Sequence, residues 1–401
     1  MTTLAVNGGP PVRTEPFAQW PVFGQLEEQA VLEVIRSGHW GGVGAPDDPN
    51  RKLHAMETAF AKLQDAAYGV SVVNGTVAIT AALLAAGVKP GDEVIMPPYT
   101  FIATASAALA FGAIPVFVDV EADTLLLDPD KIEQAITAKT KAIIAVHIAG
   151  ASADLTRILT IARARGLVVI EDAAQAVGAQ WEGKGVGSHG DFGTFSFQSS
   201  KNLNCGEGGM ITTNRPELRD GAWSICNVGR IPGGAWYQHE TIGQNYRMTE
   251  LQAALLLAQM TRLEEQMRRR ELAAKRLDEM LGGIAGIRLL RRDPRMTRHA
   301  HHLYMFKLDE SATEGQGKVE TVRRLNAEGI PAMAGYVPLH RNEAILGSIR
   351  LWTGEERTFD CPVCDRMCER EVLWLPQNVL LSDDRALRDV ATALEKVIRH
   401  P

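Results

Sequence analysis

The chain has 401 residues, of which 45% are hydrophobic and 22% are charged, and its formal net charge is −6. This length suits two or three domains of roughly 150 residues each, and the composition is that of a globular enzyme. The negative charge disfavours a nucleic-acid binder, which more often presents a basic face. No apolar run approaches the roughly 18 residues of a membrane helix, and the N-terminus lacks the features of a secretory signal. We therefore expect a cytoplasmic enzyme, and five cysteines in so long a chain do not indicate a disulfide scaffold.

Short β-rich runs alternate with helix-like segments through the first half of the chain. Strands are predicted at 70–73, 93–96, 115–118, 142–146 and 167–171, and helices at 76–86, 102–110 and 154–165. This alternation predicts βαβ units and a mainly parallel α/β sheet that is covered on both faces. Ligands of such sheets gather at the carboxyl ends of the strands, and these ends are at Asn74, 97–101, His147 and Asp172.

The second half begins with a long helix and then changes character. The capping-box pattern at 249–252 starts a helical stretch that reaches to about Leu281. Strands are predicted at 286–290 and 302–308, and helices at 319–327 and 384–399. We therefore predict a large domain over residues 1–283 and a smaller α+β domain over residues 284–401, with the first 35 or so residues packing against the smaller one.

Two side chains in neighbouring segments could bind the aldehyde and the pyridine nitrogen of pyridoxal phosphate (PLP). Asp172 ends an apolar strand, and Lys201 follows a β-like run at 192–197. A lysine amine can form a Schiff base with the aldehyde of PLP, and a carboxylate can keep the pyridine nitrogen protonated. Taken singly, a loop lysine is usually solvated, and an aspartate after a strand can simply cap the next helix.

A possible phosphate site lies upstream, where Asn74-Gly75-Thr76 opens a helix-like stretch. Free backbone N–H groups and the helix dipole at such a start favour a phosphate dianion. Turn glycines are common, so this signal is weak without the other two side chains.

Taken together, Asp172, Gln175, Ser196, Lys201 and the turn at Asn74 resemble the DegT/StrS family of PLP-dependent aminotransferases, from about residue 20 to residue 380. The resemblance implies the fold-type-I architecture, with a large mainly parallel-sheet domain and a small C-terminal domain. It also implies that an amino group passes from glutamine or glutamate to a ketone on a polyhydroxylated ring. The enzyme would be a homodimer with shared active sites.

The resemblance implies roles for individual residues as well. Lys201 would carry the cofactor, and Asp172 would hold its pyridine nitrogen. Gln175 would contact the phenolic oxygen of the ring, and Phe101 would stack on the ring, although a core phenylalanine would fit the same sequence. Residues expected to hold the phosphate are Gly75, Thr76, Ser196 and, from the partner subunit, Asn245.

Substrate contacts are expected from four further residues. Arg247 could bind the carboxylate of the amino donor, because a guanidinium fork suits a carboxylate, although a structural ion pair is the simpler reading. The full set is Trp40, His147, Arg247 and Tyr336.

The identity of the acceptor is open between three substrates. Nucleotide-sugar members of the family usually carry a Thr-Thr-Gly-like loop and a His-x-Tyr-Gly segment. Here these places read His-Trp-Gly-Gly at 39–42 and His-Ile-Ala-Gly at 147–150. The segments 8–13 and 20–21 resemble the cyclitol and aminohydroxybenzoate branch. We expect a keto-cyclitol such as scyllo-inosose, with a nucleotide-linked keto-sugar or an aminohydroxybenzoate synthase reaction as alternatives.

Two other motifs point to different classes of protein. The segment 185–190 satisfies the dinucleotide pattern G-x-G-x-x-G but leads into a β-like run where that motif requires a helix, which disfavours a nicotinamide oxidoreductase. Cys361, Cys364 and Cys368 could offer three thiolates, but no fourth ligand is evident and we expect no metal. A sensor or regulator built on the same fold would have lost the lysine or gained a DNA-binding module, and the sequence shows neither.

Overall fold

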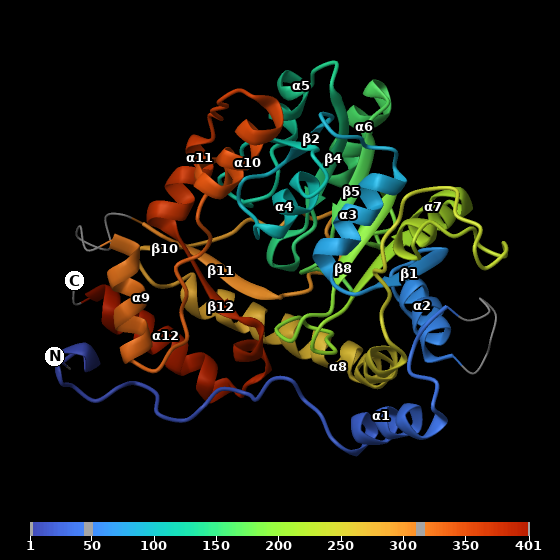
Figure 1. Ribbon diagram of the computed structural model, residues 1–401. Helices are drawn as coiled ribbons and strands as arrows, with labels where there is room; N and C mark the ends of the chain where they lie inside the picture. Colours follow the sequence, from blue (N-terminus) through green and yellow to red (C-terminus); the bar gives the residue numbers. More distant parts are fainter. Residues whose placement is uncertain (1–2, 44–50, 310–316, 400–401) are drawn as a thin grey trace.

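A seven-stranded sheet forms the centre of the larger part of the molecule (Figure 1). The computed structural model describes residues 3–43, 51–309 and 317–399. Within these residues the strands lie in the order β1 (Tyr68–Val72), β9 (Gly209–Thr213), β8 (Phe192–Ser196), β5 (Val168–Asp172), β4 (Thr140–Val146), β2 (Glu93–Met96) and β3 (Ile114–Phe117). Both pairings of β9 are antiparallel and the other pairings are parallel, so β9 alone runs against its neighbours. The predicted mainly parallel α/β sheet is confirmed.

Helices follow the strands and pack on the sheet. Helix α3 (Gly75–Ala85) lies against β8 and β9, and α6 (Leu155–Arg165) lies against β4 and β5. The residues of α3 are apolar almost all round, which is the pattern of a helix buried on most of its surface. The other helices of this part are α2 (Lys52–Leu63), α4 (Ala103–Leu109), α5 (Ile132–Ala135) and α7 (Pro216–Cys226).

A small antiparallel sheet organises the C-terminal part. It consists of β10 (Ile287–Leu289), β11 (Leu303–Leu308) and β12 (Val372–Pro376), with β11 in the middle. Helices α9 (Gly317–Ala327) and α12 (Asp384–Arg399) contact each other and share one apolar core with this sheet. Helix α10 (Glu343–Thr353) packs instead against α4, and α11 (Pro362–Arg366) continues into a π-helical turn.

Helix α8 (Glu250–Leu281) links the two cores. Its first half contributes Ala253 and Leu263 to the core of the large sheet, and its last turns contribute Leu277 and Leu281 to the small core. The helix begins at Thr249, where both hydrogen bonds of the predicted capping box are formed.

The N-terminal segment runs along the small part before it reaches α1 (Gln25–Ser37), which packs on α8 (Figure 1). Leu4 is buried in the small core, and the backbone N–H groups of Ala5 and Val12 donate to the carboxylate of Glu328. The domain boundary after residue 283 stays a prediction, because α8 belongs to both cores. A short hairpin of β6 (Gln180–Trp181) and β7 (Lys184–Gly185) completes the described strands.

In the described ranges, no helix combines the length and the apolar composition needed to cross a membrane.

Candidate functional site

Four strand ends bring the predicted cofactor residues to one edge of the sheet. Strands β1, β2, β5 and β8 run in the same direction, so their carboxyl ends lie along the same edge. Asn74 follows β1, Phe101 follows β2, Asp172 ends β5 and Ser196 ends β8. This is the edge at which parallel sheets bind ligands.

Asp172 is held in a fixed orientation at this edge. Its side chain is buried, and Oδ2 accepts a hydrogen bond from the Thr104 hydroxyl at 2.7 Å. Oδ1 accepts from the backbone N–H of Ala174 at 3.2 Å, and Thr104 is itself within 3.0 Å of the Thr100 hydroxyl. Thr104 escaped the sequence analysis because a threonine in a short helix carries no signal of its own.

Lys201 occupies a crowded position in the loop after β8. Burial lowers the pKa of its ammonium to about 8, although the negative charge of Asp172 acts in the opposite direction. A lysine that forms a Schiff base must release its proton near neutral pH, and desolvation is one way to lower its pKa. A turn sets the backbone here, because the Lys201 N–H donates to the carbonyl of Gln198 at 2.8 Å.

Gln175 and Tyr336 connect the two parts of the molecule beside Asp172. The Gln175 amide donates to the Tyr336 hydroxyl at 2.7 Å, and its oxygen accepts from the Ala149 N–H at 2.7 Å. Burial raises the pKa of Tyr336 to about 12; the Gln175 hydrogen bond opposes this shift and the charge of Asp172 adds to it. Tyr336 therefore stays protonated, and its ring packs edge-on against Tyr99.

The start of α3 forms a cradle of the right kind for a phosphate. The Asn74 side chain accepts from the Val77 N–H, which leaves the N–H groups of Gly75 and Thr76 without a partner inside the helix. A Cβ on Gly75 would lie 2.8 Å from the Ser196 Cβ, so only glycine lets the helix start approach the end of β8 so closely. The Ser196 hydroxyl and these N–H groups thus belong to one small region.

Phe101 lies at the surface of the same edge. Its side chain is 58% exposed, which rules out the alternative of a core phenylalanine. Its carbonyl accepts from the N–H of Thr104, the residue that also bonds Asp172. An exposed ring at this place is available to stack on a planar ligand.

The predicted substrate contact of His147 is wrong. The side chain is fully buried, and both ring nitrogens are used: Nε2 lies 3.0 Å from Glu171 Oε2, and Nδ1 accepts from the Ala153 N–H at 3.1 Å. Its position after β4 correctly indicated the edge of the sheet but not the direction of the side chain. His147 therefore stabilises the fold.

Glu171 also binds the loop that contains the dinucleotide-like motif at 185–190. The N–H groups of Gly187, His189 and Gly190 all donate to its carboxylate, at 2.6, 2.8 and 2.7 Å. The loop is an anion-binding nest whose anion is a side chain of the same protein. Its donors are not free to bind a nucleotide.

In the described residues, three predicted site residues have no hydrogen bond or ion pair to Asp172 or Lys201. Asn245 is exposed on a segment that runs beside β1, where the neighbouring Tyr246 carbonyl accepts from the Val73 N–H at 2.8 Å. The Trp40 side chain is 56% exposed, and its indole N–H donates to the carbonyl of Ile35 at the end of α1. In the described part of the chain, no hydrogen bond or ion pair links either residue, or Arg247, to the cofactor edge.

Arg247 lines an opening among α2, β1 and α7. Its Nη1 is buried without a hydrogen-bond partner in the described residues. Burial lowers the pKa of its guanidinium, and the charge of Arg230 adds to this. The side chain as a whole is partly exposed, and no ion pair of Arg247 is found among the described residues, so the alternative of a structural ion pair has no support in a single copy of the chain.

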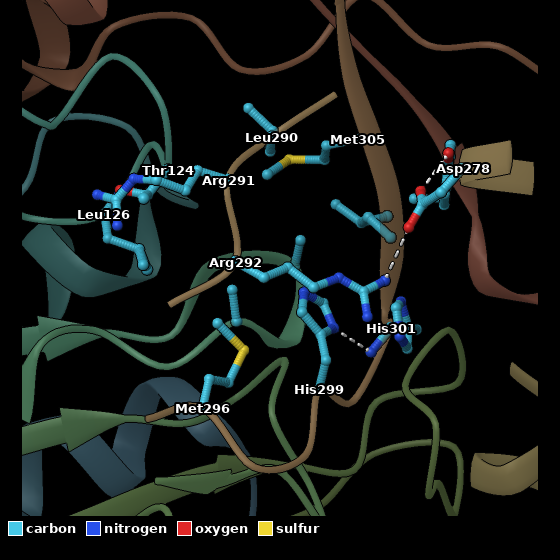
Figure 2. Close-up of a pocket in the computed structure, with 14 residues that line it drawn as sticks. Thr124, Leu126, Asp278, Leu290, Arg291, Arg292, Met296, His299, His301 and Met305 are labelled. Carbon is cyan, nitrogen blue, oxygen red and sulfur yellow. Dashed lines mark hydrogen bonds and ion pairs between the residues drawn. The ribbon is translucent and has the colours of Figure 1, made fainter. Parts of the chain in front are cut away.

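Two further clusters lie outside this edge. Arg292, His299 and His301 line one opening (Figure 2), and the rings of the two histidines stack with their centroids 4.1 Å apart. The cysteines at 361, 364 and 368 are buried free thiols. Within the described residues, no group of three or more His, Cys, Asp or Glu side chains could hold a metal ion.

Comparisons with known proteins agree with this geometry. Residues 22–395 match the DegT/DnrJ/EryC1/StrS aminotransferase family. An L-glutamine:2-deoxy-scyllo-inosose aminotransferase from Streptoalloteichus tenebrarius is 37% identical over 99% of this chain and 98% of its own length. The crystal structure of a 3-amino-5-hydroxybenzoic acid synthase is 32% identical, with a TM-score of 0.87 over 97% of this chain and 100% of that one. A structure described as a sugar aminotransferase from Streptococcus pneumoniae, in its PMP form, is 28% identical, with a TM-score of 0.83 over 96% and 99% of the two chains.

Proposed function

This chain belongs to the DegT/DnrJ/EryC1/StrS aminotransferase family, and we propose that it uses PLP to move an amino group from glutamine or glutamate to a free keto-cyclitol such as scyllo-inosose. The observation that carries the proposal is the placement of Asp172 and Lys201 at the edge that also holds the cradle of Gly75 and Ser196. A phosphate cradle, a fixed carboxylate and a desolvated lysine are the groups that PLP requires.

When bound, PLP supplies an aldehyde for amine exchange and a ring that accepts electrons. Asp172 would keep a proton on the pyridine nitrogen, with Thr104 holding the carboxylate in place. Gln175 would donate to the phenolic oxygen of the ring from the position that Tyr336 now fixes. Phe101 would cover one face of the ring, and Gly75, Thr76 and Ser196 would bind the phosphate.

Lys201 would act as the acid and base. Its amine would take the proton from the donor carbon and return it to the cofactor carbon, and the reverse in the second half of the cycle. A pKa of about 8 keeps both protonation states populated near neutral pH, which is the condition for efficient proton transfer.

A free cyclitol is favoured over a nucleotide-linked sugar by two positions. Trp40 and Ala149 stand where nucleotide-sugar members of the family usually carry hydroxyl-bearing side chains. Trp40 has no hydrogen bond to the cofactor edge among the described residues of one copy of the chain, so it would offer a flat apolar wall to a compact ring only across a dimer. The relative at 37% identity is named for glutamine and a scyllo-inosose. The nucleotide-linked keto-sugar and the aminohydroxybenzoate reaction remain the alternatives.

A homodimer with shared sites would explain the residues that one copy leaves unused. Asn245 is exposed at the outer edge of β1, and Nη1 of Arg247, on the same segment, has no hydrogen-bond partner among the described residues. In a dimer, Asn245 would reach the phosphate of the partner site and Arg247 would bind the donor carboxylate there. Mixed dimers of inactive Lys201→Ala and Asn245→Asp chains should then recover activity, because one of the two sites is intact. No recovery in verified mixed dimers would reject sharing.

The acceptor is tested by the reverse half-reaction. PLP-loaded protein is mixed in turn with amino-cyclitols and nucleotide-linked amino-sugars, and conversion to the pyridoxamine form is followed by absorbance. We expect the amino-cyclitols to react faster. Faster conversion by the nucleotide-linked compounds would reject the cyclitol assignment and support the first alternative.

A further inference from the structure

The residue after Lys201 is tied to the C-terminal part of the chain. The Asn202 amide donates to the carbonyl of Ala300 at 2.6 Å, and its oxygen lies 3.1 Å from Nδ1 of His302. Both side chains are buried. Because the amide oxygen can only accept, His302 carries its proton on Nδ1, and this tautomer leaves Nε2 without one.

The same histidine continues a hydrogen-bonded path to Gln175. Its backbone N–H donates to the Ala149 carbonyl at 2.8 Å, and the Ala149 N–H donates to the Gln175 oxygen at 2.7 Å. Gly150 lets the two segments approach, since its φ is +96° and a Cβ there would lie 2.8 Å from the Ala300 Cβ. The loop that carries Lys201 is therefore connected to the residue placed at the phenolic oxygen of the ring.

His302 differs from the two other histidines of its segment. His299 and His301 line the opening in Figure 2, and His301 Nε2 lies 2.6 Å from Glu271. His302 instead faces Asn202 and lies within range of the charges of Lys201 and Arg270. Burial lowers the pKa of His302 well below its usual range, and these two cations lower it further. The imidazole is therefore neutral at physiological pH.

We propose that His302 is a positioning residue for Lys201, which it holds through the hydrogen bond to Asn202. This inference rests on the proposed function, because it assigns no role unless Lys201 carries the cofactor. The bond keeps the lysine loop packed against the C-terminal part, at a constant distance from Gln175 and Asp172. A neutral imidazole can do this beside two cations without adding a third positive charge.

Loss of this bond has a measurable consequence at the lysine amine. With no donor for its oxygen, Asn202 would turn toward water, and the loop would move with it. Lys201 is already partly exposed, and more water would then surround its amine and relieve the desolvation that lowers its pKa. Among the described residues, Asp172 and His302 are titratable groups near this amine, and the charge of Asp172 favours the ammonium in either case. The pKa of Lys201 would therefore rise toward its ordinary value.

The test compares His302→Asn with His302→Leu, two side chains of similar size. The asparagine amide places an N–H donor where Nδ1 stands, and leucine places none. We measure kcat and KM, and we follow the pKa of Lys201 in cofactor-free full-length protein by competitive labelling with acetic anhydride and mass spectrometry. We expect His302→Leu to lower kcat at least about tenfold with little change in KM and to raise the Lys201 pKa by about one unit, and His302→Asn to lose about threefold or less.

Equal kcat and equal Lys201 pKa in the two variants would overturn the proposal. His302→Gln serves if the leucine variant does not fold. Its amide lies one atom further out, so it should follow leucine in both readouts, and a glutamine variant that matches asparagine would also overturn the proposal. Borohydride trapping of the cofactor on Lys201 is checked first in the unsubstituted protein. Its failure would reject the proposed function, whereas normal trapping with indistinguishable variants would reject only the role of His302.

Discussion

Glu171 and Asp172 are neighbours at the end of β5, yet they lie in different surroundings. Successive strand residues point to opposite faces, so the two carboxylates are separated by the backbone itself. Glu171 is enclosed by three loop N–H groups and His147. Asp172 is held by the single hydroxyl of Thr104 and one backbone N–H, and its charge acts on Lys201.

The glycine-containing loops beside these carboxylates differ in the same way. Three N–H groups of the loop at 187–190 are satisfied by Glu171, whereas the turn at Asn74 leaves two N–H groups at the start of α3 for a ligand. The first loop matches a well-known nucleotide motif and the second does not. A sequence motif for anion binding thus says nothing about whether the protein already supplies the anion.

The largest expected effect comes from exchanging the two carboxylates for amides in turn. Asp172→Asn should keep the fold and lower kcat about a hundredfold or more, since an amide cannot hold the pyridinium proton. Glu171→Gln should lower the free energy of unfolding by about 1–3 kcal/mol and leave kcat of the folded protein nearly unchanged. Steady-state rates and chemical denaturation of both variants check this. A near-normal rate for Asp172→Asn would contradict the catalytic role of Asp172.

The loss of stability at acidic pH should also distinguish Glu171 from Asp172. Burial raises the pKa of Glu171, but the hydrogen bonds from His147 and the loop N–H groups outweigh it and hold the pKa below its ordinary value. Its contribution to stability is therefore complete above the unfolded-state pKa near 4.5 and is lost as the pH falls through the lower folded-state pKa. In urea titrations, the free energy of unfolding of Glu171→Gln should fall less steeply with decreasing pH than that of the unsubstituted protein. An unchanged slope would contradict the role given to Glu171.

A smaller effect is expected from adding one methyl group to each loop. Gly75→Ala brings a Cβ to 2.8 Å from Ser196 and should weaken PLP binding about tenfold through a shifted cradle. Gly187→Ala meets the Phe195 ring at 2.4 Å with a φ of +82°, so it should lower stability and not cofactor affinity. Fluorescence titration with PLP and thermal melting separate the two outcomes. Equal PLP affinities in the two variants would contradict a phosphate site at Gly75.

Much of the fold was predictable because its signals are local. The capping box at Thr249 and the strand at 93–96 depend on residues within a few positions of each other, and both are observed. Strand β9 was not predicted, and it is held in the sheet by β1 and β8, which are distant from each other in sequence. The same limit applies to the site.

Asp172 and Lys201 were recognisable by their spacing and by the family they resemble. Thr104, Asn202 and His302 were not, since each is an ordinary residue of a helix or loop until folding brings it beside one of those two. The bond between Gln175 and Tyr336 joins residues 161 positions apart, and no local pattern reports it. The error at His147 has the same origin, because a strand end fixes an edge of the sheet and not the direction of a side chain.

The most direct test of the account is to locate the cofactor on the chain. Purified protein is loaded with PLP, reduced with borohydride, digested and mapped by mass spectrometry, with Lys201→Ala and the hairpin variant Lys184→Ala treated alike. We predict one pyridoxyl group on Lys201, which is lost together with turnover in Lys201→Ala and kept in Lys184→Ala. A reduced adduct on another lysine, or a stoichiometric adduct that persists in Lys201→Ala, would contradict the assignment of this site.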